Sequence, residues 1–270
     1  MTRQALGRGI PSVRAWTRVE LLLAALLLAL AATAWVLTSV LAMPDMRLGI
    51  LSGSSPMEPG MASMSVGLGL FVLTWVVMMA AMMLPAVTPF TVGIRRLVSA
   101  GSRTRVMVAG LTVGYLVVWS AAGVVAYAVV RGFDAVVQAG STTSVRAGAV
   151  VLLAAGCYQF TPLKRWCLVR CRSPLALVMR HGPQAARGPG GALAVGARHG
   201  GYCVGCCWGL MAVLLAAGVM SLVWMAVIAA VITIEKVLPR PDLTSHLVGA
   251  GLLGAGVALF VAPGLVAAPM

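Results

Sequence analysis

Charged residues are scarce in this chain of 270 residues. They make up 10% of it, whereas soluble globular proteins contain about 25%. Hydrophobic residues make up 60%, and the mean hydropathy is +0.99. This composition excludes a soluble domain, a collagen, a disordered chain and a secreted disulfide scaffold. The sequence therefore predicts an all-α protein, a polytopic helical bundle that is embedded in a lipid bilayer.

Acidic residues are rarer still, with 6 Asp and Glu against 20 Lys and Arg, so the formal net charge is +14. Basic proteins often bind nucleic acid, but here the cations stand singly or in pairs beside apolar runs, without interleaved aromatic residues. The chain also lacks the Gly-x-x-x-x-Gly-Lys-Ser/Thr string of a phosphate-binding loop. We therefore expect neither nucleic-acid binding nor an ATP-driven pump, and no residue is assigned a catalytic role.

Long apolar runs predict about seven membrane spans, since one spanning helix needs about 20 mainly apolar residues. The runs lie at residues 19–42, 64–90, 106–130, 144–160, 201–220, 221–238 and 246–267. The fifth and sixth divide near Gly218, because the uncharged stretch from Cys203 to Ile234 would otherwise form one helix of about 48 Å, against a hydrocarbon core of about 30 Å. Six spans is the alternative count.

The basic residues occupy alternate connections between these runs. They are concentrated in residues 1–18 and in the connections that follow the second and fourth runs, the latter at residues 161–200. Loops rich in Lys and Arg stay in the cytoplasm, so we expect these segments, and the amino terminus, on the cytoplasmic side of a bacterial inner membrane. The first run extends to Leu41 and is too long for a signal-peptide core.

A methionine motif, WVVMMAAMMLP, lies in the second run. Its methionines are Met78, Met79, Met82 and Met83. Residues four apart share a helix face, so the sulfur atoms could form a ladder, and a thioether binds Cu(I) without losing a proton. The alternative is that methionine only fills space between helices. Pro85 and Pro89 follow, and we expect them to kink or end the helix.

Six cysteines lie close together in the sequence, at Cys157, Cys167, Cys171, Cys203, Cys206 and Cys207. The predicted topology puts them near the cytoplasm, where thiols stay reduced. They are therefore metal ligands, redox-active thiols or small apolar side chains.

The spacing of the cysteines puts them on common helix faces. One face carries Cys203, Cys206 and Cys207, and a short helical turn after Pro162 carries Cys167 and Cys171 on another. Thiolates suit Cu(I) or zinc, and cations near the loop pair are expected to lower the pKa of its thiols.

Two ionisable residues complete the candidate site. His199 precedes Cys203 by four residues and shares its face if the helix starts early; it is either a ligand or a hydrated surface residue. Apart from Glu20 at the start of the first run, Glu235 is the one carboxylate inside a predicted span, and Lys236 follows it. It is a candidate functional group, or it pairs with Lys236 at the interface.

Three strings together resemble a known bacterial family. They are WVVMMAAMMLPAVTP at 75–89, GCYQFTPLKRWCLVRCRSP at 156–174 and RHGGYCVGCCWGLM at 198–211. They are similar to domain of unknown function 2182, described as predicted metal-binding integral membrane proteins, with some members labelled copper chaperones. The likeness covers about residues 64–240. It implies metal binding at Met78, Met82, Met83, Lys164, Cys167, Cys171, His199, Cys203, Cys206, Cys207 and Glu235; Cys157 is not carried over.

The leading hypothesis is a membrane protein that binds a soft metal ion, Cu(I) before zinc, at its cytoplasmic side. It would deliver or store copper, or exchange it with a protein partner. The alternatives are a thiol-disulfide oxidoreductase in the membrane, a scaffold without chemistry of its own, and a transporter subunit. The last is disfavoured, because no clear repeat relates the two halves of the chain and charged residues are missing from mid-membrane positions.

Overall fold

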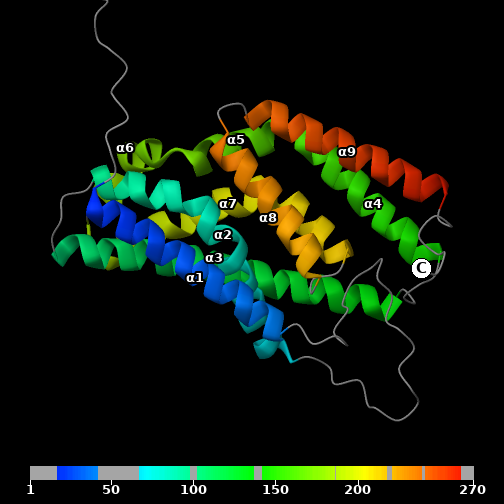
Figure 1. Ribbon diagram of the computed structural model, residues 1–270, viewed down its shortest axis with the longest axis horizontal. Coiled ribbons are helices and arrows are strands. Elements are labelled where there is room, and N and C mark those ends of the chain that lie inside the picture. Colours follow the sequence, from blue (N-terminus) through cyan, green and yellow to red (C-terminus); the bar gives the residue numbers. More distant parts are fainter. Residues whose placement is uncertain are drawn as a thin grey trace, which may run out of the picture.

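The computed structural model describes residues 17–41, 67–97, 102–136, 142–185, 187–217, 221–238 and 241–262. Regular secondary structure in these ranges is α-helical, so the all-α prediction is confirmed. The helices are α1 (Arg18–Leu41), α2 (Leu68–Leu97), α3 (Ser102–Val136), α4 (Thr142–Gln159), α5 (Pro162–Arg172), α6 (Pro174–Ala185), α7 (Pro189–Ala217), α8 (Leu222–Val237) and α9 (Pro241–Val261). Figure 1 shows their arrangement.

Five stretches of the described helices are long and apolar enough to cross a membrane. They lie at residues 18–40, 68–88, 109–132, 189–217 and 242–261, and they make this a membrane protein. The other two predicted spans form the helices α4 and α8, of 18 and 16 residues. A 16-residue helix is about 24 Å long, which is less than the hydrocarbon core. The count of seven spans therefore stays a prediction.

The long uncharged stretch is divided between two helices, as its length predicted. Helix α7 ends at Ala217 and α8 begins at Leu222. Ser221 caps α8, because its side-chain oxygen accepts a hydrogen bond from the backbone N–H of Trp224. The division near Gly218 is therefore confirmed.

The connection at residues 161–200 is helical rather than a loop. Thr161 caps α5, because its side-chain oxygen accepts a hydrogen bond from the backbone N–H of Lys164. Pro162 occupies the first position of the helix, where a backbone N–H has no partner within the helix and proline is therefore well tolerated. Helix α6 follows, and α7 starts at Pro189, about three turns before the predicted start. This early start places His199 on the same helix as Cys203, which was the condition for the two residues to share a face.

Helix α2 continues through both of its central prolines to Leu97. The expectation that Pro85 or Pro89 could end the helix is therefore wrong. Proline removes one N–H donor, and this loss is tolerated in a membrane helix that is supported by its neighbours. Helix α2 has such support, because it packs against α1, α3, α6 and α8.

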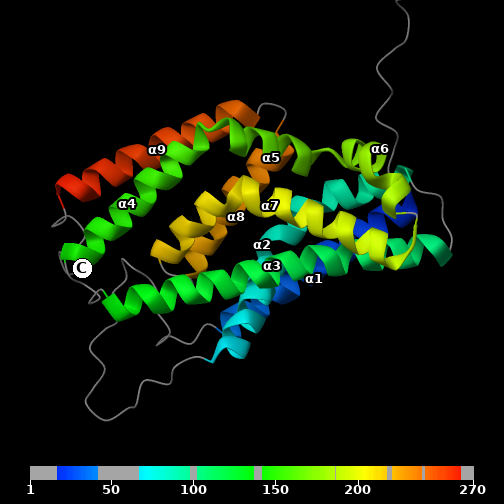
Figure 2. The ribbon, with the colours of Figure 1, turned by 180° about the vertical axis from the view of Figure 1, so that it is seen from behind.

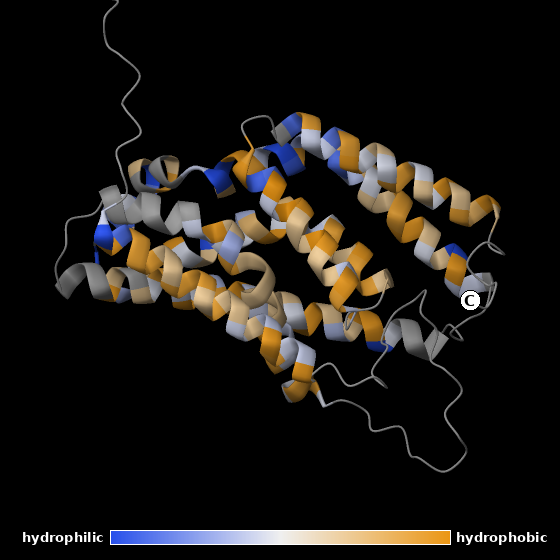
Figure 3. Ribbon diagram, viewed as in Figure 1, coloured by the Kyte–Doolittle hydropathy of each residue, from blue (hydrophilic) through white to orange (hydrophobic). Residues whose placement is uncertain are grey.

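Helix α7 occupies the centre of the bundle and packs against α3, α4, α5, α6 and α8. Helices α4 and α9 pack against each other and form a pair along one side, visible from both directions in Figures 1 and 2. Figure 3 shows that the long helices are mostly apolar, while polar residues gather around α5, α6 and the first turns of α1 and α9. Among these polar segments, α5 packs directly on α7.

Glycine residues let the backbones of α3 and α7 touch each other. A Cβ at Gly196 of α7 would overlap the carbonyl oxygen of Leu111, and a Cβ at Gly114 of α3 would overlap that of Leu193. Small residues at helix contacts permit such close approach in membrane proteins. The contact therefore fixes the distance between the two helices.

We expect Gly196→Ala to force α3 and α7 apart and to lower the free energy of unfolding by about 1–3 kcal/mol. Gly201→Ala is the matched control, because it lies on the same helix and a Cβ there meets nothing within 4 Å. Thermal unfolding of the protein in detergent measures both changes. Equal melting temperatures for the two variants would contradict the tight contact.

Candidate metal centre

The sulfur-containing residues predicted as ligands lie in one buried core cluster, at most 5% exposed. They are Met78, Met82, Met83, Cys167, Cys171, Cys203, Cys206 and Cys207. They come from three helices, α2, α5 and α7. Residues far apart in the sequence are therefore brought together, and Met211 of α7 and Met225 of α8 join the same cluster.

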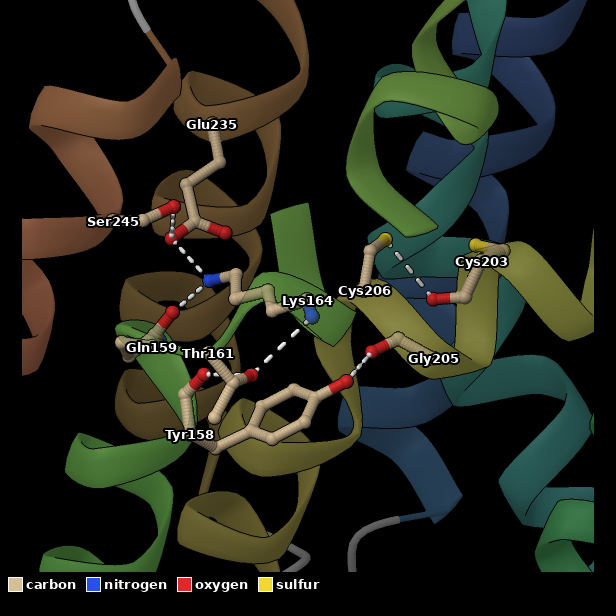
Figure 4. Close-up of polar contacts among 9 residues, drawn as sticks. All are labelled: Tyr158, Gln159, Thr161, Lys164, Cys203, Gly205, Cys206, Glu235 and Ser245. Carbon is tan, nitrogen blue, oxygen red and sulfur yellow. Dashed lines mark hydrogen bonds and ion pairs between the residues drawn. The ribbon is translucent and has the colours of Figure 1, made fainter. Parts of the chain in front are cut away.

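Helix α7 presents its three cysteines around one carbonyl group. The thiols of Cys206 and Cys207 both donate to the backbone oxygen of Cys203, at 3.1 and 3.0 Å. Figure 4 shows the first of these hydrogen bonds. The spacing of three and four residues produces this arrangement, since it returns each side chain to the same side of the helix.

The cysteines of α5 meet those of α7. Cys171 belongs to the same buried cluster as Cys203 and Cys206, and its thiol interacts with both of them. Cys167 packs on Gly205 so closely that a Cβ there would lie 2.6 Å from the Cys167 sulfur. The hydroxyl of Tyr158 donates to the Gly205 carbonyl at 2.6 Å and holds the end of α4 against the same turn (Figure 4). The two cysteine motifs therefore form one cluster.

A lysine ammonium group lies among the sulfur atoms. Lys236 Nζ is 3.2 Å from the sulfur of Cys203 and 3.7 Å from the sulfur of Met83. The Tyr115 hydroxyl lies 3.3 Å from the same Cys203 sulfur. Sequence reasoning missed both contacts. Lys236 was accounted for as an interfacial cation, and no motif marked Tyr115.

Glu235 pairs with Lys164 and not with Lys236. The Glu235 carboxylate accepts a hydrogen bond from Lys164 Nζ at 2.6 Å and another from the Ser245 hydroxyl at 3.1 Å. Lys164 Nζ also donates a hydrogen bond to the side-chain oxygen of Gln159 (Figure 4). Consecutive helical residues point about 100° apart, so Glu235 faces α5 and α9 while Lys236 faces the thiols. Of the two readings left open for Glu235, the pairing with Lys236 is therefore wrong.

The cations near Cys167 and Cys171 on α5 have other partners. Arg165 pairs with Asp242 at 3.3 Å, and Arg170 lies 3.7 Å above the ring of Trp166. Burial raises the pKa of the Cys167 thiol, and Arg170 offsets this only in part. Hydrogen bonds to Cys203 and Cys206, together with burial, raise the pKa of Cys171. Arg170 thus acts on Cys167 in the expected direction, but the pKa values of both thiols are raised overall and not lowered as expected.

The remaining candidates lie beside the cluster or outside it. His199 is buried on α7, and its ring centroid is 5.9 Å from that of Tyr115, whose hydroxyl contacts Cys203. Cys157 is exposed near the end of α4. His199 is thus connected to the thiols through an aromatic ring, whereas Cys157 stands apart from the buried cysteines.

The donor set is soft, since it consists of thiols and a thioether. Such ligands favour Cu(I) over harder ions. Among the side chains that the structure describes, no group of three or more His, Cys, Asp or Glu is arranged to hold a metal ion. A metal would therefore replace the hydrogen bonds that these thiols make, and the thiols would lose protons as they become ligands.

These observations define a helical membrane protein with a sulfur-rich interior. The model of a family described as PpoB2, copper chaperone, matches residues 72–259, which is more than half of the chain. The chain therefore belongs to this copper chaperone family. No curated protein and no solved structure matches it. The matched region includes every cysteine and methionine of the buried cluster.

The buried Lys164–Glu235 ion pair connects α5 to α8, and its contribution to stability can be measured. Removing one partner of such a pair costs about 3–5 kcal/mol because the other charge is left uncompensated. We expect Lys164→Met to lower the stability by about this amount, and Lys164→Met with Glu235→Leu to recover part of it. Thermal unfolding in detergent gives the comparison.

The neighbouring Arg165→Met is the control for this measurement. Arg165 and Asp242 form an exposed pair, with side chains 71% and 48% accessible, so its loss should cost less than about 1 kcal/mol. If Lys164→Met proves as mild as Arg165→Met, the Lys164–Glu235 pair does not hold α5.

Proposed function

We propose that this protein binds Cu(I) as its cargo in the thiol cluster around Cys203 and exchanges it with a protein partner. The observation that carries the proposal is the burial of Cys171, from α5, in one cluster with Cys203 and Cys206 of α7, on which α5 packs. Membership of a copper chaperone family supports copper as the metal. Delivery and storage both fit a site of this kind.

Cys171 and Cys203 are the first candidates for thiolate ligands, with Cys206 and Cys207 next to them. The Met83 thioether is close enough to take part, because it shares the Lys236 contact with Cys203. Zinc sites in proteins use thiolate, imidazole and carboxylate ligands, so the thioether supports Cu(I) over zinc. In this proposal the protein carries the metal and catalyses no covalent reaction.

The other methionines of α2 supply a path for the metal. Met82 directly precedes Met83, and Met78 lies about one turn before Met82 on the same helix. Both are buried and belong to the same cluster as Met83. Glu235 acts through Lys164, which it holds against α5, and His199 acts through Tyr115. In this proposal, both residues support the site.

The proposal is tested by copper binding of the full-length protein, purified in detergent without oxygen and with a reductant. We expect copper to bind and to compete with a Cu(I) chelator. Cys203→Ser should weaken binding by more than the 10–100-fold that loss of an outer-shell partner costs. Cys157→Ser is the matched control and should bind as the native chain does, since Cys157 is exposed and lies outside the cluster.

The proposal fails if the native protein does not compete with the chelator, or if the two serine variants bind copper equally. Mass spectrometry of the same samples tests the oxidoreductase alternative. Disulfides between Cys171 and the α7 cysteines that form and are reduced during turnover with a thiol substrate would favour thiol exchange over metal handling.

We also propose that the segment at residues 161–200 faces the cytoplasm, as the distribution of cations predicts. Met179 of α6 is 74% exposed, so Met179→Cys in a Cys157→Ser background gives one accessible thiol. An impermeant maleimide should label it in broken cells or inverted vesicles and not in intact spheroplasts. Labelling from outside would reverse the orientation, place the thiols towards the oxidising side and strengthen the redox alternative.

A further inference from the structure

Helix α5 lies beside the ends of several membrane helices. It directly follows α4, and its Lys164 pairs with Glu235 in the last turn of α8. Its Arg165 pairs with Asp242, the first residue of the apolar stretch at residues 242–261 that is long enough to span a membrane. Figure 1 shows α5 next to these helix ends. An 11-residue helix is about 16 Å long and cannot cross a hydrocarbon core of about 30 Å. Helix α5 is therefore positioned at the surface of the bilayer.

The two faces of α5 are the reverse of those on a helix that borders water. Its inner face is buried and consists of Lys164, Cys167, Leu168 and Cys171. Its outer face carries Leu163, Trp166 and Val169, which follow one another at a spacing of three residues and are 57%, 47% and 54% exposed. A helix that borders water exposes polar residues instead. The outer face is therefore an apolar strip that fits an apolar neighbour.

Arginine and aromatic rings border this strip, and acidic residues are absent from this part of the sequence. Residues 161–200 contain seven Lys and Arg, and no Asp or Glu occurs between residues 135 and 234. The guanidinium carbon of Arg170 lies 3.7 Å from the ring centroid of Trp166 and 5.9 Å from that of Tyr202. The two rings pack edge to face at 5.3 Å. Such a combination is typical of the boundary between lipid tails and headgroups, so the strip matches an anionic lipid surface in polarity and in charge.

We propose that the outer face of α5 binds the anionic surface of the bilayer and that this contact holds α5 over the thiols. The apolar strip enters the edge of the acyl region, and Arg170 faces lipid phosphate groups, whose geometry a guanidinium matches. On the inner face, Cys167 and Cys171 pack on the cysteine-bearing turns of α7. Lipid and thiols thus contact opposite sides of one short helix. The control of access to the thiols rests on the proposed function, whereas the lipid contact does not.

Spin labelling tests the lipid contact. Leu163→Cys in a Cys157→Ser background gives one exposed thiol on the strip, because the other cysteines are buried. The labelled full-length protein is placed in nanodiscs of phosphatidylcholine, alone or in an equimolar mixture with phosphatidylglycerol. We expect oxygen, which dissolves in lipid, to relax the label more strongly than a water-soluble nickel chelate does.

The control label is placed at Arg187→Cys, an exposed position in the turn before α7, where the nickel chelate should be the more effective relaxant. A label at Leu163→Cys that behaves like this control overturns the lipid contact and leaves a protein as the occupant of the strip.

The hold on α5 is tested by the rate at which N-ethylmaleimide labels Cys203 in the reduced, metal-free protein. Mass spectrometry gives this rate relative to that of Cys157, which is exposed near the end of α4. The ratio cancels the effect of lipid charge on the local pH and on the reagent. We expect phosphatidylglycerol to lower the ratio by at least about fivefold, which is the factor that one cation contributes near an anionic surface.

Val169→Glu and Val169→Lys are a matched pair, because they differ in the sign of one charge on the strip. Val169→Glu should abolish the effect of phosphatidylglycerol on the ratio, and Val169→Lys should keep it. The same two substitutions at Leu163 replace them if either variant does not fold. A ratio that is insensitive to lipid charge in the native chain, or equally sensitive in the two variants, overturns the hold on α5.

Failure of this inference differs from failure of the proposed function. Both measurements are made without metal, so native protein that binds no Cu(I) refutes the proposed function and leaves the lipid contact in place. Native protein that binds Cu(I) while the strip lies in water refutes the lipid contact alone.

Discussion

The backbone contact between α3 and α7 determines where every other part of the site can lie. Gly114 and Gly196 allow the two helices to touch, and Tyr115, which follows the first of these glycines, reaches the Cys203 sulfur at 3.3 Å. Helix α7 then serves as the surface on which α4, α5, α6 and α8 pack. A wider separation would remove the Tyr115 contact and open the apolar core, so close packing and the chemistry of the thiols depend on the same two glycines.

Two buried lysines of this protein differ in the groups that surround their charge. Lys164 is compensated by Glu235 and bridges α5 and α8, which makes it a fixed connection. Lys236, one residue further along α8, is opposed by sulfur. A carboxylate is ionised whether or not metal is present, whereas the charge on thiols changes when they become ligands. Metal binding at the proposed thiol site would therefore change the charge around Lys236 and leave the charge around Lys164 as it is.

The sequence predicted features that follow from spacing along one helix and missed those that depend on contacts between helices. The shared face of Cys203, Cys206 and Cys207 follows from 3.6 residues per turn, and the division of α7 from α8 follows from length. The pairing of Glu235 joins it to Lys164, 71 residues earlier, and no local pattern encodes such a contact. The continuation of α2 through Pro85 likewise depends on neighbouring helices. The capping of α5 is different, because Thr161 followed by Pro162 is a local pattern that marks the start of a helix.

The burial of the cluster restricts how the proposed cargo could be exchanged. Cys203 is 0% exposed, and a partner that takes copper by ligand exchange must bring its own ligand to the metal. Helix α5 covers the α7 cysteines with Cys167 and Cys171, is only 11 residues long, and is joined to α8 by the Lys164–Glu235 pair. Displacing α5 would uncover Cys203 and withdraw Cys171 in one movement. Exchange by this route therefore requires α5 to leave its position, and the buried ion pair opposes that movement.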